Sequence, residues 1–165
     1  MKKTEIRLLA ELLKNSKKSD RELGRVLGVS QPTVSRTRTK LERDRAIQEY
    51  TIIPDLTKLG FELMAITTGW FKVPRDKKIM EKAVAYMKKF PNIILSSRAQ
   101  GMGKDAVIIS LHKDFTDYEN FMVTLKTDWI GIVEDHESLL ISLKGFVAKP
   151  FSLKYLAEML NSSEH

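Results

Sequence analysis

The chain has 165 residues, of which 42% are hydrophobic and 30% are charged, and it contains no cysteine. This composition is that of a globular protein with one large domain or two small ones. The lack of cysteine excludes disulfides, thiolate metal sites and thiol nucleophiles. The segment from Met1 to Thr4 leads into a periodic sequence, and no stretch is apolar for long enough to span a bilayer. We therefore expect no signal peptide, no membrane partner and a cytoplasmic location.

Positive charge is concentrated in the first third of the chain. Residues 1–50 hold 13 Lys and Arg against 7 Asp and Glu, a net charge of +6, whereas residues 51–165 hold 15 against 14, a net charge of +1. A single-sign excess on one segment indicates a polyanionic partner for that segment. A basic surface that serves only solubility is the alternative interpretation of charge alone.

Two short helices are predicted before residue 28. Apolar side chains repeat at three- and four-residue spacing over residues 4–14, and residues 15–18 interrupt this pattern as a loop. Ser19 and Glu22 have the spacing of a capping box, which predicts a second helix over residues 20–27. Gly28 then ends this helix in a left-handed conformation. The side chains expected to face inward are Ile6, Leu8, Leu9, Leu12, Leu13, Leu23, Val26, Leu27 and Val29.

A third helix is predicted to begin after Ser30. Pro32 falls in its first turn, where a missing amide hydrogen costs nothing, and Val34 and Leu41 lie seven residues apart on one face. Two short helices, a glycine turn and a third helix with a polar, cationic outer face predict a helix-turn-helix. The candidate DNA-binding residues are Ser30, Gln31, Thr33, Ser35, Arg36, Arg38, Thr39, Lys40 and Arg43.

These residue types match the chemistry of DNA. Arginine pairs with two acceptors on guanine, glutamine pairs with adenine, and threonine contacts the thymine methyl group. Lysine and arginine at the rim contact phosphates. We expect Arg36 to read a base and Lys40 to bind a phosphate. A three-helix packing unit with a solvated polar face is the alternative.

Residues 46–53 alternate loosely between apolar and polar side chains and predict a strand, which would be the wing of a winged helix-turn-helix domain. We expect this domain to span residues 1–53 and a linker to span residues 54–61. Residues 149–165 are expected to form a short helix, capped by Ser152, and a frayed end at residues 162–165.

Residues 62–148 are expected to form an α+β domain. Strands are predicted at residues 63–73, 93–100, 106–111 and 139–147. Helices are predicted at residues 76–89 and after Asp114, which is a suitable N-cap. This βαββαβ order is ferredoxin-like, an antiparallel sheet with both helices on one face. Candidates for the opposite face are Ile66, Ile108 and Ile141, and a homodimer is the simplest cover for them.

Residues 20–61, which read DRELGRVLGVSQPTVSRTRTKLERDRAIQEYTIIPDLTKLGF, resemble the Lrp/AsnC family of feast/famine regulators. The resemblance implies DNA binding, dimers or higher oligomers through the ferredoxin-like domain, and small effectors such as amino acids. Two positions depart from the family: Arg45 replaces the usual glycine, and Arg38 replaces a buried aliphatic residue and is expected to extend along the helix to a phosphate.

The resemblance also places an effector site at the turn between the second and third strands. Its matching residues are Gly101, Gly103 and Asp105, and Lys104 stands where the family commonly has an aromatic or apolar residue. A plain glycine hairpin turn without a ligand is the alternative.

The sequence offers little for catalysis. It contains neither a GxxxxGK phosphate loop nor a GxGxxG fingerprint, and its three histidines lie far apart. We therefore expect no catalytic residues, no metal and no cofactor, and we interpret the segment from Asp135 to Glu137 as a polar strand entry. Sirohaem decarboxylases resemble the same fold and carry a histidine after the wing strand, whereas Thr51–Leu56 has none.

The function expected from the sequence is a sequence-specific, DNA-binding transcription regulator that acts as a dimer or higher oligomer. The alternatives are a ligand-sensing module that has lost DNA binding, or a sirohaem decarboxylase-like subunit.

Overall fold

The computed structural model describes residues 1–74 and 76–162, with Ser162 described by its backbone alone. The rest of the frayed end expected at residues 162–165 lies outside the described residues. The chain forms two compact units. One unit combines residues 1–53 with the C-terminal segment that begins at Lys149, and the other runs from Pro54 to Ala148.

The first unit contains three helices, α1 (Lys3–Lys14), α2 (Asp20–Leu27) and α3 (Gln31–Arg43). Val26, expected to face inward, is 51% exposed. Because successive residues of a helix are about 100° apart, Val26 lies well to one side of the stripe that Leu23, Gly24 and Leu27 bury. The buried core of the three helices consists of Leu8, Leu12, Leu23, Leu27, Val34 and Leu41, with Leu9, Val29 and Ile47 packed against it.

Local hydrogen bonds set the ends of these helices. The Ser19 hydroxyl accepts the Glu22 amide at 3.3 Å, and the Glu22 carboxylate accepts the Ser19 amide at 2.7 Å, which confirms the capping box. Gly28 has φ 71° and ends α2 as predicted, and Ser30 accepts the Thr33 amide at the start of α3. Arg45, where the family pattern has glycine, has φ 55°.

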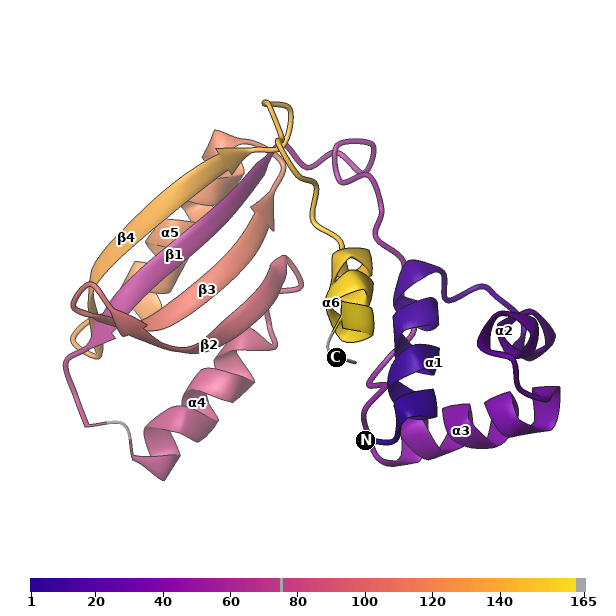
Figure 1. Ribbon diagram of the computed structural model, residues 1–165. Coiled ribbons are helices and arrows are strands. Elements are labelled where there is room, and N and C mark those ends of the chain that lie inside the picture. The colour runs from indigo at the N-terminus through magenta and orange to yellow at the C-terminus, as the bar shows by residue number, and fades with distance from the viewer. Residues whose placement is uncertain (75, 163–165) are drawn as a thin grey trace. The chain divides into compact units, whose positions relative to one another are not determined.

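The C-terminal segment completes this unit. A 3-10 turn, η1 (Leu153–Tyr155), begins at Ser152, whose hydroxyl accepts the Lys154 amide at 3.3 Å. The short helix α6 (Leu156–Ser162) follows and packs along α1, as Figure 1 shows. Ala157 is fully buried in this unit. The unit that carries α3 is therefore built from both ends of the chain.

The wing strand expected at residues 46–53 is not formed. These residues have no strand assignment, and residues 48–53 make no backbone–backbone hydrogen bond in the described part of the chain. Tyr50, Ile52 and Ile53 are all about half exposed or more. A strand needs a hydrogen-bonded neighbour as well as alternating side chains, and this segment has none within its own unit.

The second unit is a four-stranded antiparallel sheet with two helices. Its elements are β1 (Leu63–Phe71), α4 (Lys77–Met87), β2 (Ile93–Gly101), β3 (Lys104–His112), α5 (Phe115–Asp128) and β4 (Val133–Ser142). Asp76 caps α4 and Asp114 caps α5. The strand order is β2-β3-β1-β4, and both helices contribute to a single core (Figure 1). This arrangement confirms the predicted ferredoxin-like fold.

Strand register decides which side chains enter that core. Ile108 lies opposite the buried Thr67, whose hydroxyl lies 3.9 Å from the Met122 sulfur of α5. Ile108 therefore faces the helices, and its expected place on the opposite face is wrong. Ile66 and Ile141 do lie on that opposite face. Ile66 stands between two buried residues of β1 and therefore points to the other side of the sheet, and Ile141 pairs with a β1 residue that also points to that side. The core consists of Tyr86, Ile108, Phe121, Met122, Leu125 and Trp129.

The fourth strand begins and ends earlier than residues 139–147. Val133 and Glu134 already pair with β1, and the pairing shifts between Thr68 and Trp70. The sequence analysis missed the start of this strand because the stretch around Asp135 is acidic and irregular. An edge strand with one solvated face needs no apolar alternation.

Among the described helices, none has an apolar stretch of the length that a bilayer crossing requires.

Candidate nucleic-acid interface

The outer side of α3 presents a continuous polar surface. Val34 and Leu41 anchor the opposite side of the helix in the core, with 1% and 2% of their surface exposed. The 3.6-residue period then carries the intervening polar positions away from the core. The exposed predicted site residues on this outer side are Gln31, Ser35, Arg36, Thr39 and Arg43, and we call them the α3 outer face.

The two hydroxyls at the start of α3 are already organised. The Ser30 and Thr33 side-chain oxygens lie 2.8 Å apart, and the Ser30 hydroxyl accepts the Thr33 amide. Both residues are exposed. The positive end of the helix dipole and these hydroxyls form a surface that suits a phosphate oxygen.

Arg38 is not part of the α3 outer face. Its Nε and Nη2 atoms donate to one Asp20 carboxylate oxygen at 2.9 and 2.7 Å, and Nη1 lies 3.3 Å from the Tyr50 hydroxyl. Only 19% of the Arg38 side chain is exposed. The guanidinium thus ties α3 to the start of α2 and to the segment that follows α3.

Lys40 also has a partner within its own unit. Its Nζ donates to a Glu5 carboxylate oxygen at 2.5 Å, and 42% of its side chain remains exposed. The hydrogen bond from Lys40 lowers the pKa of Glu5, so the carboxylate stays charged. Lys40 links α3 to the first turn of α1 while part of its side chain remains accessible to solvent.

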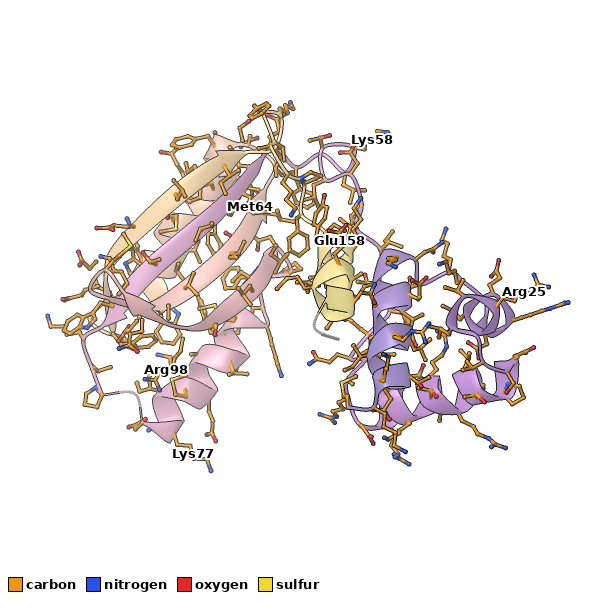
Figure 2. All side chains as sticks on the ribbon, viewed as in Figure 1. Arg25, Lys58, Met64, Lys77, Arg98 and Glu158 are labelled. Atoms are coloured by element: carbon orange, nitrogen blue, oxygen red, sulfur yellow. The ribbon has the colours of Figure 1, made fainter. Side chains whose placement is uncertain are left out.

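Three residues of α2 were missed by the sequence analysis. Arg21 and Arg25 are exposed and make no ion pair with other described residues, and Figure 2 shows Arg25 projecting from α2 into solvent. Their four-residue spacing on a helix was the available signal. Gly24 is buried, and a Cβ there would meet the Val29 carbonyl oxygen at 2.8 Å. This close approach lets the turn pass tightly over α2.

Comparisons with known proteins agree with this arrangement. The model of the AsnC-type helix-turn-helix domain matches residues 1–42. The HTH-type transcriptional regulator PH0061 of Pyrococcus horikoshii is 30% identical over 142 residues, which cover 85% of this chain and 91% of that protein. The crystal structure of PH0061 superposes with a TM-score of 0.77 over 92% of this chain and 97% of that chain.

The chain belongs to the Lrp/AsnC family of transcriptional regulators. HTH-type regulator LrpC of Bacillus subtilis is also similar, with 32% identity over 97 residues, which are 59% of this chain and 65% of LrpC. A regulator from Neisseria meningitidis, NMB0573, solved as a complex with L-Met, shares the fold at 18% identity, with a TM-score of 0.75 over 94% of this chain and 99% of that chain. The relatives are transcriptional regulators, not enzymes.

In this Lrp/AsnC regulator, the turn predicted as an effector site is a tight hairpin. Gly101 pairs with Lys104 across the two-residue loop of Met102 and Gly103, and both loop residues have positive φ, at 54° and 70°. The Asp105 carboxylate accepts the Phe71 amide at 3.0 Å. The predicted residues therefore lie together, and Asp105 has a structural role.

Lys104 is turned away from solvent, with 7% of its surface exposed. Its Nζ donates to the Asp135 carbonyl oxygen at 2.7 Å and lies 2.8 Å from the Asp135 carboxylate and 3.4 Å from that of Glu137. The hydrogen bond to Asp135 raises the pKa of Lys104, so the ammonium keeps its positive charge. The carboxylates of Asp135 and Glu137 balance this charge. The polar segment from Asp135 to Glu137 therefore binds the Lys104 ammonium. Among the described residues, no group of His, Asp or Glu side chains is arranged to hold a metal ion.

Proposed function

We propose that this Lrp/AsnC regulator binds specific DNA sequences as a dimer or higher oligomer, with α3 in the major groove of each half-site. The observation that carries the proposal is the α3 outer face, where Gln31, Ser35, Arg36 and Thr39 are exposed and the opposite side is anchored in the core. A helix fits the major groove, and these side chains match base edges there.

The surroundings of the remaining site residues support a division of roles. Ser30 and Thr33 lie at the positive end of α3, and Arg43 lies at its other end with 73% of its side chain exposed. Lys40 keeps a partly exposed ammonium beside Glu5. We assign these residues to phosphates and the centre of the α3 outer face to bases. Arg38, predicted to reach a phosphate, supports the position of α3 through Asp20.

Selection of bound fragments from random DNA tests the proposal directly. A shared motif with two-fold symmetry, with half-sites about one helical turn apart or a multiple of it, is expected. Arg36→Ala should then weaken binding to the selected site by about 5- to 150-fold, which corresponds to roughly 1–3 kcal/mol for a base contact. Lys17→Ala, which removes the same charge from the exposed loop before α2, is the matched control and should change affinity little.

Two results would reject the proposal. Selection that yields no motif, with weak binding that salt abolishes, would indicate a module that has lost specific DNA recognition. Equal losses for Arg36→Ala and Lys17→Ala at fixed salt would mean that Arg36 contributes only net charge.

The exposed face of the sheet supports a dimer. Leu95, Ile109, Ile66 and Leu139 lie side by side across all four strands, as the register places them. Leu95 is 47% exposed and Leu139 is 64% exposed in the single chain. A row of aliphatic side chains on this face favours self-association through it.

We also infer that a small effector such as an amino acid acts through the hairpin region of Gly101, Gly103 and Asp105. The L-Met complex of the Neisseria relative supports the class of ligand. Addition of L-methionine should change the affinity for the selected DNA, and Asp105→Asn should reduce that change, since an amide oxygen still accepts the Phe71 N–H but carries no charge. An undiminished response in Asp105→Asn would exclude this carboxylate from effector binding.

A further inference from the structure

A cavity of about 540 Å³ lies inside the second unit, between α4 and the sheet. Apolar side chains form most of its wall, with Met80, Ala83 and Met87 on the α4 side and Phe71 and Trp129 opposite. Asp105, which follows the hairpin, lines the cavity, whereas Gly101 and Gly103 do not. Its volume is in the range that small-molecule sites occupy, and its mostly apolar wall also carries several polar side chains, as such sites do.

Trp129 lines this cavity and also holds a buried hydrogen-bond donor. The indole is 2% exposed, and its Nε1 atom has no acceptor among the described residues. A buried donor without a partner is unfavourable, so the indole is held here by the packing of its ring.

Arg98 brings a positive charge to the same cavity. It follows Ser96 by two residues on β2, and Ser96 pairs with Ile108 on the helix-covered face, so the pleat directs Arg98 to that face as well. Figure 2 shows Arg98 on the side of β2 that faces α4. Arg98 lines the cavity and makes no ion pair with other residues that the structure describes.

The Asp105 carboxylate also lines the cavity, and it accepts the Phe71 amide at 3.0 Å. Burial lowers the pKa of His136, and the nearby Lys126 and Lys104 lower it further, so its imidazole is neutral at pH 7. The charged side chains of the wall are therefore two cations, Arg98 and Lys88, and one carboxylate that already accepts a hydrogen bond.

We propose that this cavity binds a small carboxylate with an unbranched or branched hydrocarbon body and no amino group. Arg98 donates to the carboxylate, while Met80, Ala83, Met87 and the Trp129 ring contact the hydrocarbon. Arginine matches the geometry of a carboxylate. The site borders the hairpin effector region, with which it shares Asp105, and it does not depend on DNA binding.

The fluorescence of Trp129 provides the test. The chain has two tryptophans, and Trp70→Phe leaves Trp129 as the only reporter. Three probes of equal chain length are titrated into this full-length variant in the absence of DNA: octanoate, 1-octanol and 2-aminooctanoate. Saturable binding of one octanoate per chain is expected, at least 10-fold tighter than that of the alcohol or the amino acid.

Two variants tie the binding to the cavity. Arg98→Met should weaken octanoate at least 10-fold while leaving 1-octanol unchanged, and Ala83→Leu should weaken both by reducing the space. Lys77→Met removes a charge from an exposed position at the start of α4, where 91% of the side chain is exposed, and should bind octanoate as the parent does.

Tighter binding of 2-aminooctanoate than of octanoate would overturn the proposal in favour of an amino-acid site. Equal octanoate affinity in the parent, Arg98→Met and Ala83→Leu would also overturn it, because binding would then lie elsewhere. Absence of octanoate binding rejects the site outright. None of these outcomes bears on DNA recognition, which the random-fragment selection tests separately.

Discussion

Arg36 and Arg38 stand two positions apart on α3 and have different surroundings. A two-residue step turns the helix by about 200°, so one guanidinium lies in solvent while the other reaches Asp20 and Tyr50. Periodicity alone places Arg38 beside the apolar stripe, but the partner that holds it comes from α2, eighteen residues earlier. The polar face of α3 was therefore predictable as a whole, whereas the pairing of Arg38 with Asp20 was not.

Arg38→Ala should lower the free energy of unfolding by about 1–3 kcal/mol, because Asp20 is left half-buried without its charge-assisted hydrogen bonds. Urea unfolding, monitored by far-UV circular dichroism, measures the change. Arg36→Ala, which removes an exposed guanidinium from the same helix, should leave the unfolding midpoint almost unchanged. Equal stability of the two variants would mean that the Asp20 contact contributes nothing.

His112 makes stability depend on pH. Its ring is fully buried against Phe121, its Nε2 lies 2.8 Å from the Ser110 hydroxyl, and its Nδ1 has no hydrogen-bond partner among the described residues. Burial lowers the pKa of His112, and the charge of Asp117, 3.6 Å away, only partly opposes this effect. The imidazole is therefore neutral in the folded chain.

The unfolded chain binds the proton more readily than the folded chain, so acid favours unfolding. This contribution to stability is full above the ordinary histidine pKa of about 6.5 and is lost as pH falls below it towards the folded-state pKa. One proton corresponds to at most about 1.4 kcal/mol per pH unit. Unfolding free energies at pH 7.5 and 5.5 should differ less in His112→Gln than in the parent. Burial also lowers the pKa of His136, so His136 maintains part of the pH dependence of the unfolding free energy in both proteins. An identical pH dependence in both proteins would contradict the assignment.

At the scale of elements, the sequence predicted what is fixed by neighbours along the chain. The capping box at Ser19, the left-handed Gly28 and the opening of α3 at Ser30 each depend on contacts within about five residues. The segment expected as a wing strand has no pairing partner among the described residues, and the bounds of β4 are set by its pairing with β1, far along the chain, so the expectations for both were wrong. The face of Ile108 was wrong for the same reason, since register and not alternation decides it.

The packing of α6 on α1 gives a test at this scale. Ala157 is fully buried in the unit that carries α3, so Ala157→Asp places an unpaired charge in a packed contact and should lower the stability of that unit by at least about 2 kcal/mol. Asn161→Asp adds the same charge to an exposed position of α6 and is the matched control. Unfolding and DNA titration are measured together.

We expect Ala157→Asp to lose helical structure at lower urea concentrations and to bind the selected DNA more weakly, because α1 supports α3. If Ala157→Asp and Asn161→Asp unfold at the same urea concentration, α6 is an appendage without a structural role.

At the scale of the whole molecule, one chain presents one recognition helix, and a two-fold symmetric site needs two. The row formed by Leu95, Ile109, Ile66 and Leu139 supplies a surface through which a second copy can be held. In the proposed dimer the second α3 binds from a high effective concentration, so the affinity for the full site is expected to depend on the sheet face.

Leu139→Asp places a charge on this face. Because Leu139 is 64% exposed in the single chain, the substitution leaves the core unchanged. The variant should fold and sediment as a monomer in analytical ultracentrifugation at concentrations where the parent is expected to be a dimer. It should also bind the two-half-site DNA at least 10-fold more weakly, while its affinity for an isolated half-site stays the same. Ile130→Asp changes an apolar residue that is 81% exposed and lies between α5 and β4, outside the sheet, and it should remain dimeric. A dimeric Leu139→Asp would place the subunit contact elsewhere, and a monomeric variant with unchanged affinity for the full site would separate DNA recognition from assembly.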